Sequence, residues 1–394
     1  MRKLFSRCAG VLWLALLIGA LISAQTAAAQ GDAAQLVGRA VMPANTQVDG
    51  QPAGAALAAG ALVNGVKFPF DSQPVGTISA VLPGEYPGTW LLLVDGQFGI
   101  PAQSGDYLLR MYTVELAFRR AQSGAGDVSL LNWQHLGDPD GKIERRIVNA
   151  ETRLRYLSGA DFVPRAFQRT PGGAFWVADA NSPVLLRFDA FGKLLEAPVA
   201  LDGGALHGMS IYPDGSALII AQRSTANRQQ VVFRAYDLTT RTFTDLPANY
   251  TLESANHIVG GFAMINSQEA FIVEADANEN RAAAFKRVFL INIASGGKTQ
   301  VADLLNLADP SGISTSEVFS APPNAFGLGN PFRFPFSAIS ALYPIDEQTI
   351  LIANNNRLPY GLGRSNAEAD ATEFIAVRLA QPFALDSAFQ RPIR

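Results

Sequence analysis

The hydrophobic pattern of the chain consists of short apolar runs that end in polar residues. One such run, 350–353, leads into Asn354, Asn355 and Asn356, and a Pro/Gly-rich loop separates it from a second run at 374–379. Asparagine is a poor strand former, so the first run is predicted to be a strand that ends at a rim and pairs with the second. The same arrangement occurs along the chain, and the polar residues that end the runs are Asp95, Asp179, Gln222, Glu274 and Asn354.

The spacing of these end residues indicates a repeat. Consecutive members are 84, 43, 52 and 80 residues apart, and a repeat of about 40–50 residues built from short strands is typical of a β-propeller. Each long separation has room for one more unit. We therefore predict an all-β fold, a β-propeller of six or seven blades. No segment shows a helical period over three turns, which an α/β fold would need.

The N-terminus has the pattern of a secretory signal. Basic residues precede the apolar run 11–22, and Ala27, Ala28 and Ala29 form a small-residue cleavage site. The run is short for a membrane-spanning helix, although an uncleaved anchor is the alternative. We expect residues 1–29 to be removed and the mature protein to be secreted or periplasmic, with no integral membrane association. Removal would also take Cys8, the one cysteine, and would leave no disulfide.

Composition favours a single β-rich domain over residues 30–394. Charged residues make up 16% of the chain, below the roughly 25% of an average domain, and the 35 glycines and 23 prolines suit short strands joined by tight turns. Residues 30–70 have a weak pattern and are predicted to be an N-terminal arm or first strand. The net charge of −3 and the lack of a basic stripe argue against nucleic acid. Nothing indicates an oligomer, so a monomer is expected.

Eight segments, taken in order, are similar to those of a known family. They are VDGQFGIPAQSGDYLLRMYTV, YLSGADF, FWVADANSPVLLRFDAFGKLL, HGMSIYPDGSALII, FIVEADANENRAAAFKRVFLINI, VADLLNLADP, FRFPF, and TILIANNNRLPYGLGR with TEFIAVRL. From about residue 75 to 382 the chain thereby resembles the phytase-like (esterase-like activity of phytase) β-propellers of secreted bacterial proteins. The resemblance implies a propeller that hydrolyses phosphate esters with the help of bound calcium.

The chain departs from that family's pattern at acidic positions. Six carboxylates of the pattern are replaced, by Val163, Arg165, Ala180, His207, Ser340 and Asn355. Calcium takes six to eight oxygen ligands, including several carboxylates for tight binding, and an arginine beside a metal adds an unfavourable charge. A site for several calcium ions is therefore less expected here than in the typical relative.

The resemblance implies roles for the residues that survive. Ca²⁺ would be held by Asp95, Asp179, Glu274 and Asp276, with Asn354 as a neutral oxygen donor. Arg364 would meet the phosphate of a small phosphorylated ligand, and a metal-bound water would attack it. The candidate catalytic residues are Asp179, Asp95 and His207, of which His207 would act as a general base. The alternative is a catalytically inactive propeller that serves as an extracytoplasmic binding or scaffold module.

Structural roles stay open for the same residues. Asp95 and Asp179 fit Asx-turns that hold loop backbone. Glu274 and Asp276 are two residues apart, so an extended chain puts both on one side, where they would attract a cation or a basic partner. The other interpretation is a solvated loop neutralised by Arg281, Lys286 or Arg287.

The histidines and the asparagines also have simpler interpretations. The triplet Asn354–Asn356 can serve backbone hydrogen bonds alone, and His207 can bond a backbone carbonyl. His135 and His257 have no partner at metal-binding spacing and are expected to be structural or exposed.

Overall fold

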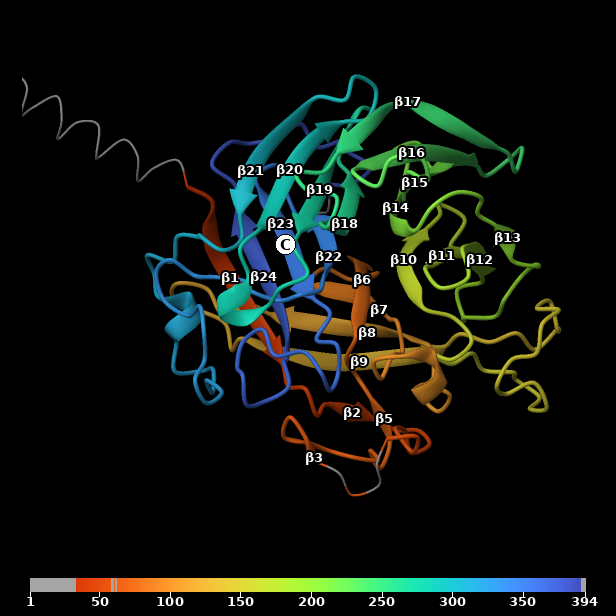
Figure 1. Cartoon of the computed structure of the whole chain (residues 1–394), viewed down its shortest axis with the longest axis horizontal. Helices are drawn as coiled ribbons and strands as arrows, with labels where there is room; N and C mark the ends of the chain where they lie inside the picture. Colours follow the sequence, from red (N-terminus) through yellow and green to blue (C-terminus); the bar gives the residue numbers. More distant parts are fainter. Residues whose placement is uncertain (1–32, 58–59, 61, 391–394) are drawn as a thin grey trace, which may run out of the picture.

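The structure, a computed structural model, describes residues 33–57, 60 and 62–390, so the predicted signal at residues 1–29 lies outside the described residues. Five four-stranded antiparallel sheets are arranged around a central axis (Figure 1). In chain order their strands are β6 (Ile78–Pro83), β7 (Thr89–Val94), β8 (Arg110–Ala117) and β9 (Asp127–His135); β10 (Pro164–Arg169), β11 (Phe175–Asp179), β12 (Val184–Phe188) and β13 (Val199–Ala200); β14 (Leu206–Ile211), β15 (Ala217–Arg223), β16 (Gln230–Asp237) and β17 (Phe243–Thr251); β18 (Ile258–Met264), β19 (Glu269–Ala275), β20 (Lys286–Asn292) and β21 (Lys298–Asp303); and β22 (Ile339–Pro344), β23 (Thr349–Asn354) and β24 (Thr372–Arg378), completed by β1 (Gln35–Met42).

These sheets are the five blades of a closed propeller, numbered here in that order. The first strand of each blade, β6, β10, β14, β18 or β22, contacts the first strand of the next blade, and β22 contacts β6. The N-terminal strand β1 pairs antiparallel with β24 and forms the outer strand of the fifth blade. The ring is therefore closed by strands from both ends of the described chain, and the sheet edges that remain are the short outer strands of the blades.

The expectation of six or seven blades is wrong, because the propeller has five. The two long separations hold loops in place of further blades. The loop at 136–163 is fixed by Asp138, which accepts N–H groups from Lys142 and Ile143. The loop at 304–338 is fixed by Asp309, which accepts N–H groups from Ile313 and Ser314. Buried carboxylates satisfy backbone N–H groups of these loops, so the loops lengthen the separations without adding strands.

Smaller elements complete the chain. Two short ribbons pair β2 (Gln47–Val48) with β5 (Gln73–Pro74) and β3 (Leu62–Val63) with β4 (Val66–Lys67). Three 3₁₀ turns are η1 (Pro101–Gln103), η2 (Asn280–Ala282) and η3 (Ile313–Thr315). In the part of the chain that the structure describes, no helix has the length and apolar character needed to cross a bilayer.

The core lies between neighbouring blades, and its packing explains the apolar runs of the sequence. Trp176 of the second blade meets Tyr236 of the third edge-on, with ring centroids 5.5 Å apart. Phe233 of the third blade stacks on Phe262 of the fourth at 5.6 Å. A strand between two such layers is buried on both faces, and all six residues of β7 are buried. Such strands read as continuous apolar runs instead of alternating ones.

Candidate functional site

The five polar residues that end the apolar runs occupy equivalent places in the five blades. Asp95 follows β7, Asp179 ends β11, Asn354 ends β23, and Gln222 and Glu274 are the penultimate residues of β15 and β19. Each of these second strands pairs antiparallel with its blade's first strand. The five residues therefore gather at one end of the ring. We call this end the mouth, defined by Asp95, Asp179, Gln222, Glu274 and Asn354.

Just inside the mouth, every first strand carries a β-bulge. The pairing register shifts at one residue in each blade, and these residues are Ser79, Arg165, His207, Gly260 and Ser340. A bulge leaves its extra residue out of the ladder and redirects its side chain. Four of the five line a central cavity of about 30 Å³, which is the share of one water molecule in the liquid. A larger ligand must therefore bind outside this constriction.

Two bulge residues, Arg165 and His207, place a guanidinium and an imidazole at the constriction. Arg165 Nη2 donates to the carbonyl oxygens of Val259 (2.7 Å) and Gly260 (3.3 Å). His207 is only 8% exposed, and its Nε2 has no hydrogen-bond partner. Burial, together with the positive charges of Arg223 and Arg165, lowers the pKa of His207 to about 3. The imidazole is therefore neutral at physiological pH, with one nitrogen left unpaired.

Asp95 lies in the electrostatic field of Arg165. Its Oδ1 accepts the N–H of Gln97 at 2.9 Å, and its Oδ2 accepts Nδ2 of Asn355 at 2.7 Å. Burial raises the pKa of Asp95 to about 6, although these hydrogen bonds and the charge of Arg165 oppose the increase. Two of the candidate catalytic residues, Asp95 and His207, are thus brought together around Arg165.

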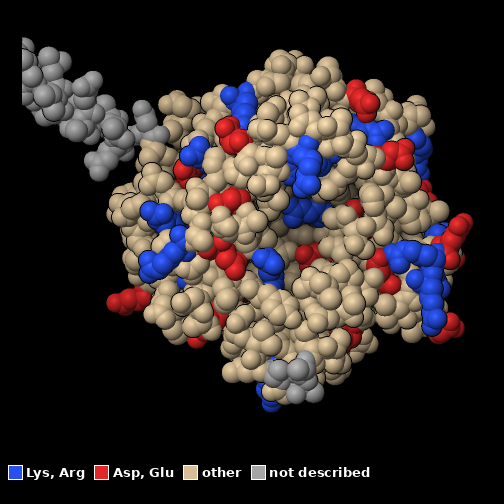
Figure 2. All heavy atoms as spheres, viewed as in Figure 1, with Lys and Arg blue, Asp and Glu red and all other residues tan. Residues whose placement is uncertain are grey.

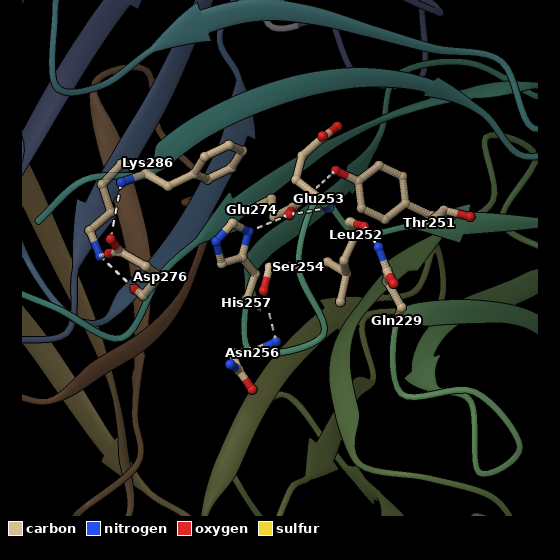
Figure 3. Close-up of polar contacts among 12 residues, drawn as sticks. Gln229, Thr251, Leu252, Glu253, Ser254, Asn256, His257, Glu274, Asp276 and Lys286 are labelled. Carbon is tan, nitrogen blue, oxygen red and sulfur yellow. Dashed lines mark hydrogen bonds and ion pairs between the residues drawn. The ribbon is translucent and has the colours of Figure 1, made fainter.

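Glu274 forms a dyad with a histidine that sequence reasoning missed. Its fully buried carboxylate accepts His257 Nδ1 and the N–H of Glu253 on Oε1, both at 2.6 Å (Figure 3). On Oε2 it accepts the Tyr250 hydroxyl at 2.5 Å, and Lys298 Nζ lies 3.6 Å away. This is the arrangement in which a carboxylate orients a histidine and stabilises its protonated form.

The dyad leaves one nitrogen of His257 available. With Nδ1 donating to Glu274, Nε2 carries the lone pair of the neutral ring, and among the described residues the hydrogen bond of the ring is the one at Nδ1. The ring packs against Phe285 with centroids 4.4 Å apart, and Arg223 Nη2 donates to the His257 carbonyl at 2.6 Å. His257 immediately precedes β18, so it stands at the mouth beside Arg165 and Arg223.

Strand pairing is the signal that could have found the dyad. Val259 pairs with Glu274 in the β18–β19 hairpin, which places His257, two residues earlier, beside the Glu274 side chain. The sequence separation of 17 residues matches no metal-binding or catalytic motif, so the expectation that His257 is structural or exposed missed this contact.

Asp276 has a different partner from Glu274. Lys286 Nζ lies 2.6 Å from its Oδ1 (Figure 3), and its Oδ2 accepts the N–H groups of Ala284 (2.9 Å) and Phe285 (3.1 Å). Burial opposes ionisation of Asp276, but these contacts outweigh it and keep the pKa of Asp276 below its usual value. The carboxylate is therefore ionised and already neutralised by a lysine.

The other predicted site residues are held by loop backbone. Asp179 accepts the N–H groups of Val163 and Ser182, and burial raises the pKa of Asp179 to about 6. Asn354 accepts the N–H of Glu373 at 2.7 Å and donates to the carbonyl of Ala371 at 3.0 Å. Both side chains fix the loops that surround the mouth.

Arg364, predicted to meet the phosphate, is buried and fully engaged by protein groups. Its Nε and Nη2 contact the two carboxylate oxygens of Glu373 at 2.8 and 2.9 Å. Its Nη1 donates to the carbonyls of Phe326 and Arg333. Arg39 also pairs with Glu373 at 2.9 Å, so the two arginines and one glutamate form a buried network that ties β1 to the fifth blade.

The predicted calcium ligands do not fit a shared cage. Among the described residues, no group of three or more His, Cys, Asp or Glu side chains could hold a metal ion. Glu274 and Asp276 direct their oxygens to protein donors, and Asp179 does the same. A calcium cage needs several carboxylate oxygens that are free to converge on one point. We therefore derive no chemical step through calcium.

The charge around the ring is mixed. On the face shown in Figure 2, Lys and Arg side chains and acidic side chains both border the central hollow. At the mouth, Arg165 and Arg223 both act electrostatically on His207. The site thus combines fixed positive charge with titratable acids and histidines.

Comparison with known proteins decides the family. The family model described as Phytase-like, esterase-like activity of phytase, matches residues 73–356. The chain belongs to this family. The resemblance inferred from the sequence is thereby confirmed, and the five-bladed ring is the fold of a phytase-like propeller in this chain. No curated protein matches the chain.

Several solved structures resemble the chain at low identity. Hydrazine synthase of Kuenenia stuttgartiensis is 10% identical with a TM-score of 0.35, over 73% of this chain and 58% of that one. A luciferin-regenerating enzyme is 9% identical with a TM-score of 0.35, over 88% and 97%. The Cps50 (Swd1) β-propeller domain of Myceliophteria thermophila is 9% identical with a TM-score of 0.32, over 72% and 64%. The chain thus spans less than two thirds of the hydrazine synthase chain.

Proposed function

We propose that this phytase-like propeller hydrolyses phosphate esters at its mouth, with the His257–Glu274 dyad as the base. The observation that carries the proposal is the 2.6 Å contact between His257 Nδ1 and a buried Glu274 carboxylate, at the mouth of a chain whose family is phytase-like. The N-terminal pattern supports a secreted or periplasmic location, which stays a prediction, as does the monomeric state.

Positive charge at the mouth supports a phosphorylated ligand. Arg165 comes from the second blade and Arg223 from the third, and both lie near enough to His207 to lower its pKa. Guanidinium groups bind phosphate oxygens through paired N–H donors. His207 Nε2 is unpaired, so as an N–H tautomer it would donate to the phosphate oxygen nearest the constriction.

The reaction requires one proton to leave water and one to reach the leaving group. His257 Nε2 takes a proton from a water whose oxygen forms the new bond to phosphorus, and Glu274 stabilises the imidazolium that results. Arg165 and Arg223 stabilise the charge on the transferring phosphoryl group. As the ester P–O bond breaks, Asp95 donates its proton to the leaving oxygen. A carboxyl with a pKa of about 6 can hold that proton in mildly acidic solution.

The test compares two histidine variants on a panel of phosphomonoesters that includes phytate. His257→Gln removes the base and lowers kcat by about 10²-fold or more. His135→Gln is the matched control, because His135 ends an outer strand and stacks on Tyr156 with centroids 4.1 Å apart. It keeps kcat within about twofold, as expected of a residue outside the site. If His257→Gln keeps the wild-type kcat, or the wild type releases no phosphate from any ester, the proposal is wrong and a binding or scaffold role takes its place.

A further inference from the structure

The end of the propeller opposite the mouth opens into a second and much larger cavity. The first strand of each blade begins at the mouth, so its last residue lies at this opposite end. The cavity has a volume of about 1260 Å³, against about 30 Å³ at the constriction. Both are lined by Val81, Gln168, Phe262 and Leu342. The large cavity therefore follows the axis of the ring up to the constriction, and we call it the funnel.

The inner wall of the funnel is a ring of five strand ends, most of them apolar. The last residues of the first strands all line the cavity, and they are Pro83, Arg169, Ile211, Met264 and Pro344. Four of these five are apolar, and the shared wall next to the constriction is mostly apolar as well. Such a wall favours a ligand with an apolar body, because binding removes apolar surface of both partners from water.

Exposed apolar side chains continue this surface outward. Tyr86, Leu131 and Phe191 all line the funnel, and all three are exposed to solvent. Large apolar side chains that gather around a cavity while still in contact with water are typical of a binding site.

The charge around the axis of the funnel comes from Arg169. Among the described residues, the charged side chains that line the cavity are Arg169, Arg120 and Glu85. Arg120 follows β8 and Glu85 lies in the β6–β7 turn, so these two opposite charges stand outside the ring of strand ends. The side chain of Arg169 is exposed and, in the part of the chain that the structure describes, has neither an ion pair nor a hydrogen bond. Its guanidinium is therefore available to a carboxylate, which it can bind through paired N–H donors.

We propose that the funnel binds an amphipathic monoanion of the fatty-acid class, with its alkyl chain along the axis and its carboxylate on Arg169. The four apolar strand ends account for the chain, and the single guanidinium among them accounts for the single negative charge. The inference concerns the end of the ring opposite the mouth, so it does not rest on the proposed hydrolysis.

Calorimetric titration with butanoate, hexanoate, octanoate and decanoate tests the apolar half of the inference. The affinity of the wild type should increase about fourfold with each methylene that the funnel buries. An affinity that does not depend on chain length would overturn the inference, as would a wild type that binds none of the four acids.

The charged half is tested with octanoate and with 1-octanol, which has the same chain and no charge. Arg169→Met should bind octanoate about tenfold more weakly than the wild type, because a charge-assisted contact is lost. Its affinity for 1-octanol should stay within about twofold. The matched control is Arg378→Met, which removes an exposed arginine at the end of β24 and should leave both affinities unchanged. If Arg169→Met binds octanoate as tightly as the wild type does, the inference is wrong.

A variant that fills the funnel shows where the ligands bind. Ile211→Trp adds bulk within the ring of strand ends and should abolish binding of both octanoate and 1-octanol, with circular dichroism reporting whether it is folded. If it does not fold, the comparison of Arg169→Met with Arg378→Met decides. Sedimentation that finds the wild type dimeric and a folded Ile211→Trp monomeric would assign the funnel to a second copy of the chain and overturn the inference.

Discussion

Glu274 and Asp276 are two residues apart at the same end of the fourth blade, but their side chains have different partners and different roles. Both are acids near the mouth, and both are paired with a basic side chain at 2.6 Å. The partner of Glu274 is His257, whose side chain is 13% exposed and whose Nε2 is free of hydrogen bonds in the described structure. The partner of Asp276 is Lys286, which is fully buried and has all three N–H donors occupied. The free Nε2 of His257 allows the Glu274 pair to take part in chemistry, whereas the fully occupied Lys286 ammonium gives the Asp276 pair a structural role.

The largest expected effect is on stability and comes from removing the Lys286–Asp276 pair. Lys286→Met leaves Asp276 buried and unpaired, so the unfolding free energy should fall by about 3–5 kcal/mol. In protein that remains folded, kcat on a phosphomonoester should stay near the wild-type value. Urea unfolding and steady-state kinetics measure the two quantities. A variant with unchanged stability would show that the Lys286–Asp276 pair does not hold the loop between β19 and β20.

Glu274→Gln tests the proposed catalytic role of the His257–Glu274 dyad. Gln keeps the shape of the side chain but removes the charge that stabilises protonated His257, so kcat should fall by about 10²–10³-fold. Its NH₂ group also faces donors that now bond a carboxylate, so some stability is lost. Circular dichroism of the folded variant separates the two effects. Wild-type kcat in this variant would mean that the dyad is only structural.

The pH dependence of stability sharpens the contrast with carboxylates that lack a basic partner. Asp179 has a pKa of about 6 in the folded protein against an ordinary 3.8, so the folded state binds the proton more tightly. Its contribution to the unfolding free energy is therefore lost as pH rises from about 4 to about 6, and it is constant above that. The wild-type value minus that of Asp179→Asn should fall over this range by at most about 3 kcal/mol. If the difference in unfolding free energy between the wild type and Asp179→Asn increases with pH, the pKa of Asp179 is not raised in the folded protein.

Arg165→Met has the smallest expected effect. Loss of one guanidinium should raise KM for a phosphomonoester about tenfold and weaken inhibition by inorganic phosphate equally. Arg120→Met is the control, because Arg120 follows the end of β8 that lies opposite the mouth, where its guanidinium lies 5.7 Å from the centroid of the Phe118 ring. Equal KM values for the two variants would place phosphate binding away from Arg165.

The sequence predicted the residues at the strand ends correctly, but it did not predict the number of blades. Apolar runs that end in Asp95, Asp179, Gln222, Glu274 and Asn354 mark the second strand of every blade, because those strands are buried on both faces until they reach the mouth. The predicted blade count was wrong because the spacing of the strand ends cannot distinguish an additional blade from a long loop. Only the partners of Asp138 and Asp309 reveal how those loops are held.

The candidate site was predictable only in part. The family resemblance placed His207 and Asp95 at the mouth, where the structure brings them to Arg165. The same reasoning grouped Glu274 with Asp276, since the two-residue spacing places both on one side of a strand. It could not show that separate partners, His257 and Lys286, direct their carboxylates to different contacts, because those partners depend on the β18–β19 register and on the loop that follows.

Release of phosphate by the wild-type protein, measured in EDTA and in Ca²⁺ and repeated with His257→Gln, is the most direct test of chemistry at the mouth. We expect the wild type to release phosphate at the same rate in both solutions, and the variant to be slower by about 10²-fold in both. Hydrolysis that stops in EDTA, returns with Ca²⁺ and is indifferent to His257 would contradict the account.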